Sequence, residues 1–416
     1  MDLFSTSHPV TTGVDISSRA FWDLPFNERD KSFARLRAAA PVSWHPPVEV
    51  GQEHAEAGFW AVTRAEDLTA VERSTEVFQS RYGISLTPTP VEQATAGVFF
   101  LTMDPPEHSR YRGLVSAAFT PRAIRQVSER IEANARAIVD DLAGAGDIDF
   151  VQACSSRLPM ETVSDMVGVP QADRERVAKA AEVLVAIGTG GALSEDQAQV
   201  AAEEFLFLYS TGTSLAAHRR QHPGDDLMTN LVQAEVDGER LTDDHIGQFM
   251  VLMAVAGNDT TKQTTTSAML ALQRHPEQRD WLMADFDGRI TGAVEEFVRY
   301  ATPVMQFTRT AARDAELNGA QVAAGDKVVL FFCSGNRDES VTEAPGEFNI
   351  ARPRTQHVAF GAGGPHFCLG HGVARTQLRA IIGQLLTRLP GLELGEPTAL
   401  RSNFINGITA LPARTG

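Results

Sequence analysis

The residue with the clearest potential for chemistry is Cys368, which stands in the glycine-rich segment from Phe360 to Gly370 (FGAGGPHFCLG). Glycines let a backbone approach a flat ligand closely and turn its amide N–H groups toward one point. A thiolate at that point is stabilised by those donors and by a metal ion. From His371 onward the sequence turns helical, so we expect the sulfur near a helix N-terminus, where negative charge is favoured. The alternative is a free cysteine in the core.

The two other cysteines, Cys154 and Cys333, lie far from Cys368 in the sequence, and no pair forms a CxxC motif. A zinc site or a disulfide framework is therefore not expected. We interpret Cys154 and Cys333 as core residues, which is the usual fate of a lone cysteine. Cys368 remains as the candidate for a single-thiolate metal ligand.

An acid and an alcohol, Asp259 and Thr260, are adjacent in the middle of a predicted helix. Leu252, Ala256 and Thr260 recur at helical spacing and share one face, where the small Ala256 would leave room for a ligand. The simpler interpretation is that Thr260 bonds its own backbone and that Asp259 pairs with Lys262 on a wet face. The residues alone favour that simpler interpretation.

A second pair of charged residues, Glu296 and Arg299, is spaced so that both side chains lie on one helix face. As an exposed ion pair it would contribute less than about 1 kcal/mol. Taken in isolation, the spacing indicates no more than a surface pair.

Long helical patterns surround these residues. The clearest helix is predicted over Asp243–His275, with Thr242 as its N-cap and Pro276 directly after its end. At 1.5 Å per residue it spans roughly 50 Å, so it is expected to cross the molecule. Further helices are predicted over residues 107–143 with a break at 120–121, 171–187, 194–219 and 287–300. Short strands are predicted over residues 59–63, 306–311, 316–317, 327–332 and 404–411.

These patterns predict a mainly α protein with a small β region. Residues 1–20 are polar and are expected to form a flexible N-terminal segment. Residues 21–416 show no repeat and no linker, and we expect them to form one domain.

The composition excludes several classes of partner. Fifty-three acidic and 37 basic residues give a net charge of −16, which disfavours binding to nucleic acid or to an anionic membrane. No apolar run approaches the roughly 20 residues that cross a bilayer, and the N-terminus does not resemble a secretion signal. We therefore expect a cytoplasmic protein without a membrane anchor.

The Phe360–Gly370 segment resembles the heme-binding loop of the cytochrome P-450 family of heme-thiolate monooxygenases, and the resemblance extends over roughly residues 20–412. It implies the cytochrome P-450 fold, in which the long central helix crosses a buried heme b, with Cys368 as the axial iron ligand. The loop departs from the family pattern by one inserted residue, because Phe360 stands eight positions before the cysteine instead of seven. The insertion puts the detailed hydrogen bonding around the sulfur in question.

The same resemblance implies roles for the charged residues. Thr260 would hydrogen-bond iron-bound dioxygen and Asp259 would relay protons to it. Glu296 and Arg299 would be buried beneath the heme loop with a further arginine. Since this chain has Glu347 where relatives often carry that arginine, we assign its place to Arg352. The groups expected to hold the heme propionates are His108, Arg112, Arg309 and His366.

The substrate pocket implied by the resemblance carries few charges, which indicates a mostly apolar ligand. Its predicted lining residues are Phe99, Phe100, Leu252, Val255, Ala256, Met305, Phe307 and Phe404. The segments AGNDTT, VMQFTRTA and GDKVVLFFCSGNRDES are similar to the actinobacterial branch of the family that acts on branched lipids, sterols and terpenoids. We therefore expect hydroxylation of an isoprenoid, a sterol or a methyl-branched lipid.

The family's reaction inserts one atom of dioxygen into a C–H bond, with electrons from a ferredoxin-type donor and its NAD(P)H-dependent reductase. Basic residues expected to flank the docking face for an acidic ferredoxin are Arg122, Arg125, Arg375 and Arg379, although scattered solvated arginines are an equal interpretation. Three alternatives remain open at this point: a peroxygenase, a non-enzymatic heme-thiolate sensor and a heme-free helical binding protein.

Overall fold

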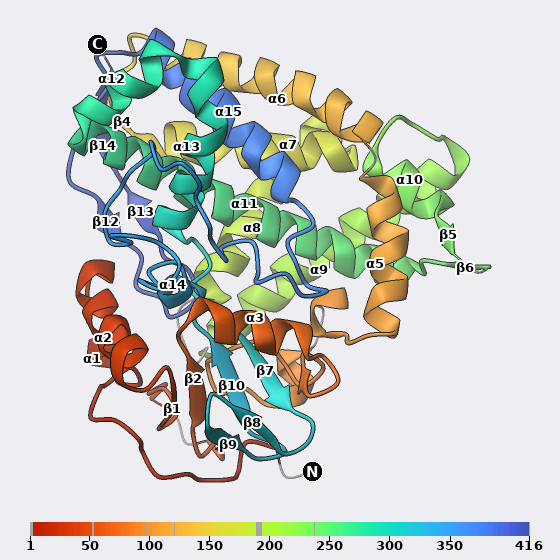
Figure 1. Ribbon diagram of the computed structural model, residues 1–416. Coiled ribbons are helices and arrows are strands. Elements are labelled where there is room, and N and C mark those ends of the chain that lie inside the picture. The colour runs from red at the N-terminus through yellow and green to blue at the C-terminus, as the bar shows by residue number, and fades with distance from the viewer. Residues whose placement is uncertain are drawn as a thin grey trace.

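The computed structural model divides into a large helical region and a smaller β region, which lies at the bottom of Figure 1. Within the described part of the chain, none of the helices combines the length and the apolar composition needed to cross a bilayer. The predicted mainly α fold with a small β region is confirmed. The residues described are 3–51, 54–95, 99–119, 121–188, 194–236 and 238–415.

Helix α11 (Asp243–Arg274) runs through the middle of the helical region, as Figure 1 shows. The Thr242 side chain accepts a hydrogen bond from the amide of His245, and the His245 ring accepts one from the amide of Thr242, which fixes the start of the helix. Pro276 begins the next helix and cannot continue α11. The predicted bounds therefore differ from the observed ones by one residue.

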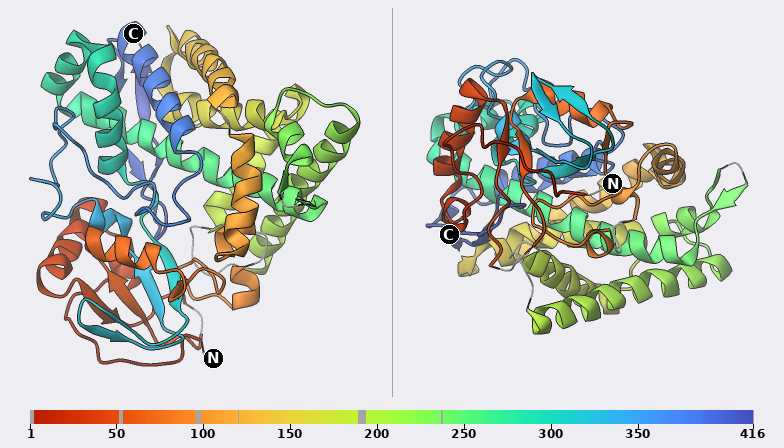
Figure 2. Two further views of the ribbon diagram at one scale, coloured as in Figure 1. Left: turned by 45° about the vertical axis from the view of Figure 1, so that its right-hand side comes forward. Right: turned by 90° about the horizontal axis from the view of Figure 1, so that it is seen from below.

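Helices cover α11 on several sides, and the largest hydrophobic core lies among them. Helices α7, α8 and α9 pack against α11, as do α13 and α15, while α15 packs on α6. Figure 2 shows α9 along the outer edge of the helical region. The other helices are α1 (Arg19–Trp22), α2 (Phe26–Ala39), α3 (Ala65–Arg73), α4 (Val91–Ala94), η1 (Phe99–Thr102), α5 (Glu107–Ala118), α6 (Pro121–Leu142), η2 (Val151–Ser155), α7 (Arg157–Val167), η3 (Gln171–Asp173), α8 (Arg174–Gly188), α9 (Glu195–Gln221), α10 (Leu227–Gln233), α12 (Pro276–Ala284), α13 (Phe286–Ala301), α14 (Phe332–Gly335) and α15 (His371–Arg388).

The main sheet joins segments that are far apart in the sequence, with strand order β1-β2-β10-β7-β3. Strand β10 pairs parallel with β2 and antiparallel with β7, and a second hydrophobic core lies on this sheet. The strands are β1 (Val42–His45), β2 (Phe59–Val62), β3 (Phe78–Gln79), β4 (Gly146–Asp149), β5 (Glu235–Val236), β6 (Glu239–Arg240), β7 (Phe307–Ala311), β8 (Ala315–Leu317), β9 (Ala320–Val322), β10 (Lys327–Leu330), β11 (Glu393–Leu394), β12 (Thr398–Ala399), β13 (Ile408–Ala410) and β14 (Pro412–Thr415).

Two strand predictions are wrong at their ends. The run 327–332 stays extended only to Leu330, because Phe332 begins α14 and packs its ring into the core. The run 404–411 is not one strand, since Ile405 forms an isolated bridge with Val304 and β13 starts at Ile408. An apolar run shows that a segment is buried but does not distinguish a strand from a buried turn.

The N-terminal segment expected to be flexible makes specific contacts with the β region. Phe4 is buried and its backbone exchanges hydrogen bonds with Gly325 and Ala57, and Ile16 is fully buried in a third hydrophobic core. His8 bonds the Asp326 carboxylate at 2.7 Å. Two apolar residues, Phe4 and Ile16, therefore anchor this mostly polar segment to the β region.

Candidate active site

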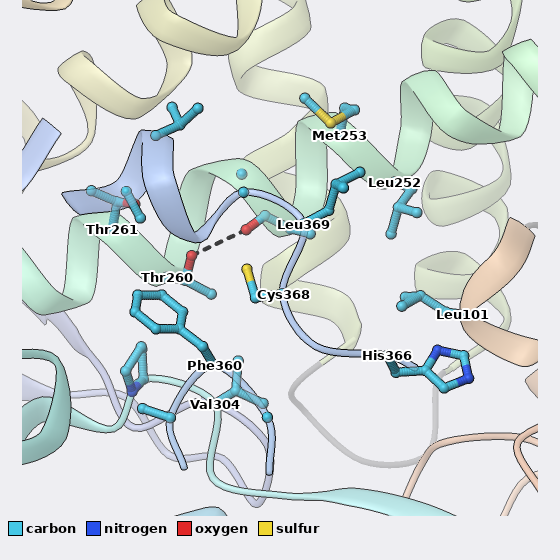
Figure 3. Close-up of a pocket in the computed structure, with 18 of the residues that line it drawn as sticks. Leu101, Leu252, Met253, Thr260, Thr261, Val304, Phe360, His366, Cys368 and Leu369 are labelled. Carbon is cyan, nitrogen blue, oxygen red and sulfur yellow. Dashed lines mark hydrogen bonds between the residues drawn. The ribbon is translucent and has the colours of Figure 1, made fainter. Parts of the chain in front are cut away.

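A large cavity lies between helix α11 and the loop 360–370, and it contains most of the chemically interesting residues. Figure 3 shows Cys368 on this loop between Phe360 and Leu369, with Thr260 and Leu252 on the helix across the cavity. Gly361 has a φ of +98°, a conformation that glycine adopts most readily, and it helps the loop to curve around the sulfur. The predicted meeting of the cysteine loop with the long helix is thus present in the structure.

The loop aims backbone donors at the sulfur of Cys368. The amide of Cys368 donates to the Phe360 carbonyl at 2.8 Å, and the amides of Gly370 and His371 donate to the sulfur at the start of α15. Burial raises the pKa of the Cys368 thiol, while the Gly370 amide and the Arg112 guanidinium oppose that rise. A metal cation would complete the stabilisation of the thiolate.

Cys154 and Cys333 have no such surroundings. Both are fully buried, and burial raises the pKa of each thiol to about 12. They are core residues, as the sequence predicts.

Cationic and imidazole groups gather at one end of the cavity. Arg112, Arg309 and His366 line it, and the ring of the fully buried His108 lies 4.1 Å from that of His366 between centroids. Both ring nitrogens of His108 lack a hydrogen-bond partner among the described residues. Burial and the nearby Arg112 lower the pKa of His108 to about 4. Such a cluster can receive an anionic group that brings its own acceptors.

One face of α11 forms the opposite wall. Leu252, Ala256 and Thr260 line the cavity together, as their spacing predicts, and the Thr260 hydroxyl donates to the Ala256 carbonyl at 3.1 Å. Asp259 pairs with Lys262, which agrees with the simpler interpretation, but the pair is not on a wet face because the Asp259 side chain is only 4% exposed. Asp259 Oδ2 has no hydrogen-bond partner in the described structure.

Glu296 and Arg299 form a fully buried ion pair on α13 with two contacts of 2.7 Å. Arg299 also donates to three backbone carbonyls, and Arg352 Nε lies 3.4 Å from Glu296 Oε1. The interpretation as a surface pair is therefore wrong. The assignment of Arg352 as the third member agrees with its position. The carbonyls that Arg299 contacts belong to Asn336, Pro345 and Glu347.

Comparisons with known proteins identify the family. A cytochrome P450 family model matches residues 213–390. The chain is 38% identical over 406 residues to the methyl-branched lipid omega-hydroxylase of Mycobacterium tuberculosis, covering 96% of this chain and 94% of that protein. It is 36% identical to the steroid C26-monooxygenase of Mycobacterium bovis over 95% of this chain and 91% of that one. The chain belongs to the cytochrome P450 family.

A solved structure extends the same result to three dimensions. The cytochrome P450 of Mycobacterium marinum in complex with pseudoionone superposes with a TM-score of 0.92 at 50% identity, covering 98% of this chain and 99% of that one. A cytochrome P450 is an oxidoreductase that incorporates oxygen from O2, and its cofactor is heme b.

The residues around the cavity fit that cofactor. Cys368 offers a sulfur surrounded by backbone donors, which suits an iron ligand. The partnerless nitrogens of His108, together with Arg112 and Arg309 at the cavity edge, suit the two propionates of heme b. Phe360 and Gly370 line the cavity on either side of the cysteine, as the resemblance implies.

The residues predicted to line the substrate pocket are only partly found in the lining of this cavity. Of its eight residues, the cavity is lined by Phe100, Leu252, Ala256 and Phe307. The other four, Phe99, Val255, Met305 and Phe404, do not line it. The Phe99 ring packs on Tyr111, and Met305 is buried in the third hydrophobic core.

Phe249 and Met253 also line the cavity but were not predicted from the sequence. They lie seven and three residues before Ala256, so the helical spacing that links Ala256 to Thr260 could have found them. Val255 is adjacent to Ala256 and is therefore turned by about 100° away from that face.

The four arginines expected at the docking face are not equivalent. Arg375 is half-buried and bonds both oxygens of Glu295, at 2.6 and 2.8 Å, and its guanidinium lies 4.5 Å from the centroid of the Phe360 ring. Arg379 pairs with Asp287. Arg125 is exposed, and the side chain of Arg122 lies outside the described part of the structure. Arg375 therefore supports the heme loop and is not a free surface cation.

Proposed function

We propose that this cytochrome P450 hydroxylates a lipophilic substrate such as an isoprenoid, a sterol or a methyl-branched lipid. The observation that carries the proposal is the largely apolar lining of the cavity. Its apolar side chains include Phe100, Leu101, Phe249, Leu252, Met253, Val304 and Phe307. Among the described residues, its charged lining side chains are Glu72, Arg112 and Arg309, and the two arginines are the groups expected to hold heme propionates. The mycobacterial relatives are named for hydroxylation of methyl-branched lipids and for oxygenation of steroids, which agrees with this class of substrate.

Different residues would hold the iron and the propionates of the cofactor. Cys368 would bind the iron through its sulfur, and Arg112, Arg309, His108 and His366 would hold the propionates. When bound, heme b supplies oxygen activation and the transfer of one oxygen atom to carbon. The apolar wall excludes water and orients a hydrocarbon segment toward that centre.

Two residues of α11, Asp259 and Thr260, are proposed to transfer protons into the cavity. The Thr260 hydroxyl lines the cavity and donates its proton to the Ala256 carbonyl, a bond that could be exchanged for one to a group bound in the cavity. Asp259 does not line the cavity, but its carboxylate is buried with Oδ2 free of partners. Lys262 holds the other oxygen, so Asp259 can turn between Lys262 and a water near Thr260.

Electrons are proposed to come from a ferredoxin-type donor and its NAD(P)H-dependent reductase. The exposed Arg125 offers positive charge outside the cavity, which suits an acidic partner on a chain of net charge −16, whereas the charge of Arg379 is taken up by Asp287.

The test is a titration of the heme-loaded protein with a substrate panel, followed by the low-to-high-spin change of the heme absorption. Methyl-branched lipids, sterols and isoprenoids should each be tried, with a polar macrolide and a small aromatic as controls. A spin change with a lipid, followed by a hydroxylated product with ferredoxin, reductase and O2, supports the proposal. A spin change confined to the polar controls contradicts the substrate class. Turnover only with hydrogen peroxide would instead indicate a peroxygenase.

A further inference from the structure

Glu72 is the one carboxylate among the described residues that line the heme cavity, and neither the sequence motifs nor the proposed reaction gives it a role. It lies in the last turn of α3 and its side chain is 2% exposed. A buried acid at the edge of a site that must receive two propionates is unexpected, because like charges oppose one another strongly where water is excluded.

The partner of Glu72 is Arg309, one of the residues expected to hold a propionate. Arg309 Nη2 donates to Glu72 Oε1 at 2.7 Å, and Arg309 Nη1 donates to the Thr308 carbonyl at 2.7 Å. A guanidinium has five N–H donors in a rigid fork. These two contacts therefore leave donors for a second anion, and Arg309 faces the cavity where that anion would lie.

The heme loop holds Glu72 in place from the other side. A Cβ added at Gly364 would meet the Glu72 carbonyl oxygen at 2.3 Å and Glu72 Oε2 at 2.9 Å. The backbone of the 360–370 loop thus packs directly against the last turn of α3. Glu72 cannot swing toward the loop, so its carboxylate stays on Arg309.

We propose that Glu72 is a positioning residue of the heme site that acts through Arg309. It fixes the direction of the guanidinium, and its negative charge competes with a heme propionate for that guanidinium. This competition weakens the binding of heme to the protein. It also leaves more negative charge near the iron, which favours the ferric state and lowers the reduction potential.

The test compares Glu72→Gln with the wild type in the heme-loaded protein. Glutamine keeps an oxygen that accepts the Arg309 bond but removes the charge. Heme transfer to an excess of a heme-scavenging apoglobin should become about fivefold slower, which is the scale of the difference between a neutral and a charge-assisted hydrogen bond. The midpoint potential of the substrate-free protein, measured by spectroelectrochemistry, should shift to a more positive value.

Glu56→Gln is the matched control, because Glu56 forms a largely buried ion pair with Lys327 at 2.6 Å in the β region but lies outside the cavity lining. It should change neither quantity. In an Arg309→Gln background the effect of Glu72→Gln should disappear. An unchanged potential together with unchanged heme loss overturns the proposal, as does faster heme loss in Glu72→Gln. An effect that persists in full without Arg309 overturns the claim that Glu72 acts through it.

Discussion

The buried pair of Glu296 and Arg299 offers the sharpest test of how this fold is held together beneath the heme loop. The perturbation is Glu296→Gln, which preserves the shape of the side chain and removes its charge. Arg299 is 0% exposed, so its guanidinium would be left in the interior without a counter-ion. The Asn349 amide donates to Glu296 Oε1 at 2.9 Å, and in the variant its acceptor would be neutral instead of charged.

The magnitude follows from what remains around Arg299. Breaking a buried ion pair by removing one partner costs about 3–5 kcal/mol. Three carbonyls continue to accept from Arg299, and the glutamine oxygen can still accept one bond. We therefore expect the free energy of unfolding to fall by about 3 kcal/mol, at the lower end of that range. Against a total of roughly 5–15 kcal/mol, that is a large fraction.

The assay is urea unfolding followed by tryptophan fluorescence, with heme content measured on the same samples by absorption. The matched control is Asp147→Asn, which removes one partner of the pair with Arg414, whose side chains are 76% and 69% exposed. That control should leave the unfolding midpoint unchanged. If Glu296→Gln also lies within about 0.5 kcal/mol of the wild type, the range of ordinary surface substitutions, the reasoning about the buried pair is refuted.

Three further outcomes are expected. Cys368→Ser should lose the absorption band that marks a thiolate opposite carbon monoxide in the reduced protein; a retained band would exclude Cys368 as the ligand. Thr260→Ala should keep the substrate-induced spin change but divert electrons to peroxide, measured as peroxide formed per NAD(P)H, and unchanged coupling would contradict the proton role. Although burial opposes it, hydrogen bonds from Arg375 and His357 lower the pKa of Glu295 to about 2. The stability that Glu295 contributes relative to Glu295→Gln should therefore be complete above pH about 4.5 and decline as the pH falls toward 2; a difference that stays constant in acid would argue against the ion pair.

The sequence predicted those features that depend on local chemistry. Helix α11 was predicted to within one residue, because Thr242 caps its start and Pro276 blocks its continuation. The face of Leu252, Ala256 and Thr260 follows from helical spacing alone. The same spacing turns Val255 away from that face, whereas the orientation of Phe99, Met305 and Phe404, which also do not line the cavity, depends on packing between distant segments.

Long-range packing also explains why the surroundings of Arg375 and the presence of Glu72 at the cavity could not be predicted from the sequence. Arg375 is four residues beyond His371 in a helix, and nothing local indicates that Glu295 from α13 takes up its charge. Glu72 ends a short helix near the N-terminus, nearly 300 residues from the loop that covers it. Sequence motifs identify residues that act within one segment, whereas these contacts arise only when segments meet.

Two of the buried arginines, Arg299 and Arg309, show how structural and ligand-binding roles can be separated. Every nitrogen of Arg299 has a partner: Glu296 receives two bonds, and backbone carbonyls receive the rest. Such a group has no donor left for a ligand, so its contribution is to stability. Arg309 uses only two of its nitrogens within the described structure and faces the cavity. Arg309 therefore keeps N–H donors for a further anion, and its bond to Glu72 would affect how it holds that anion.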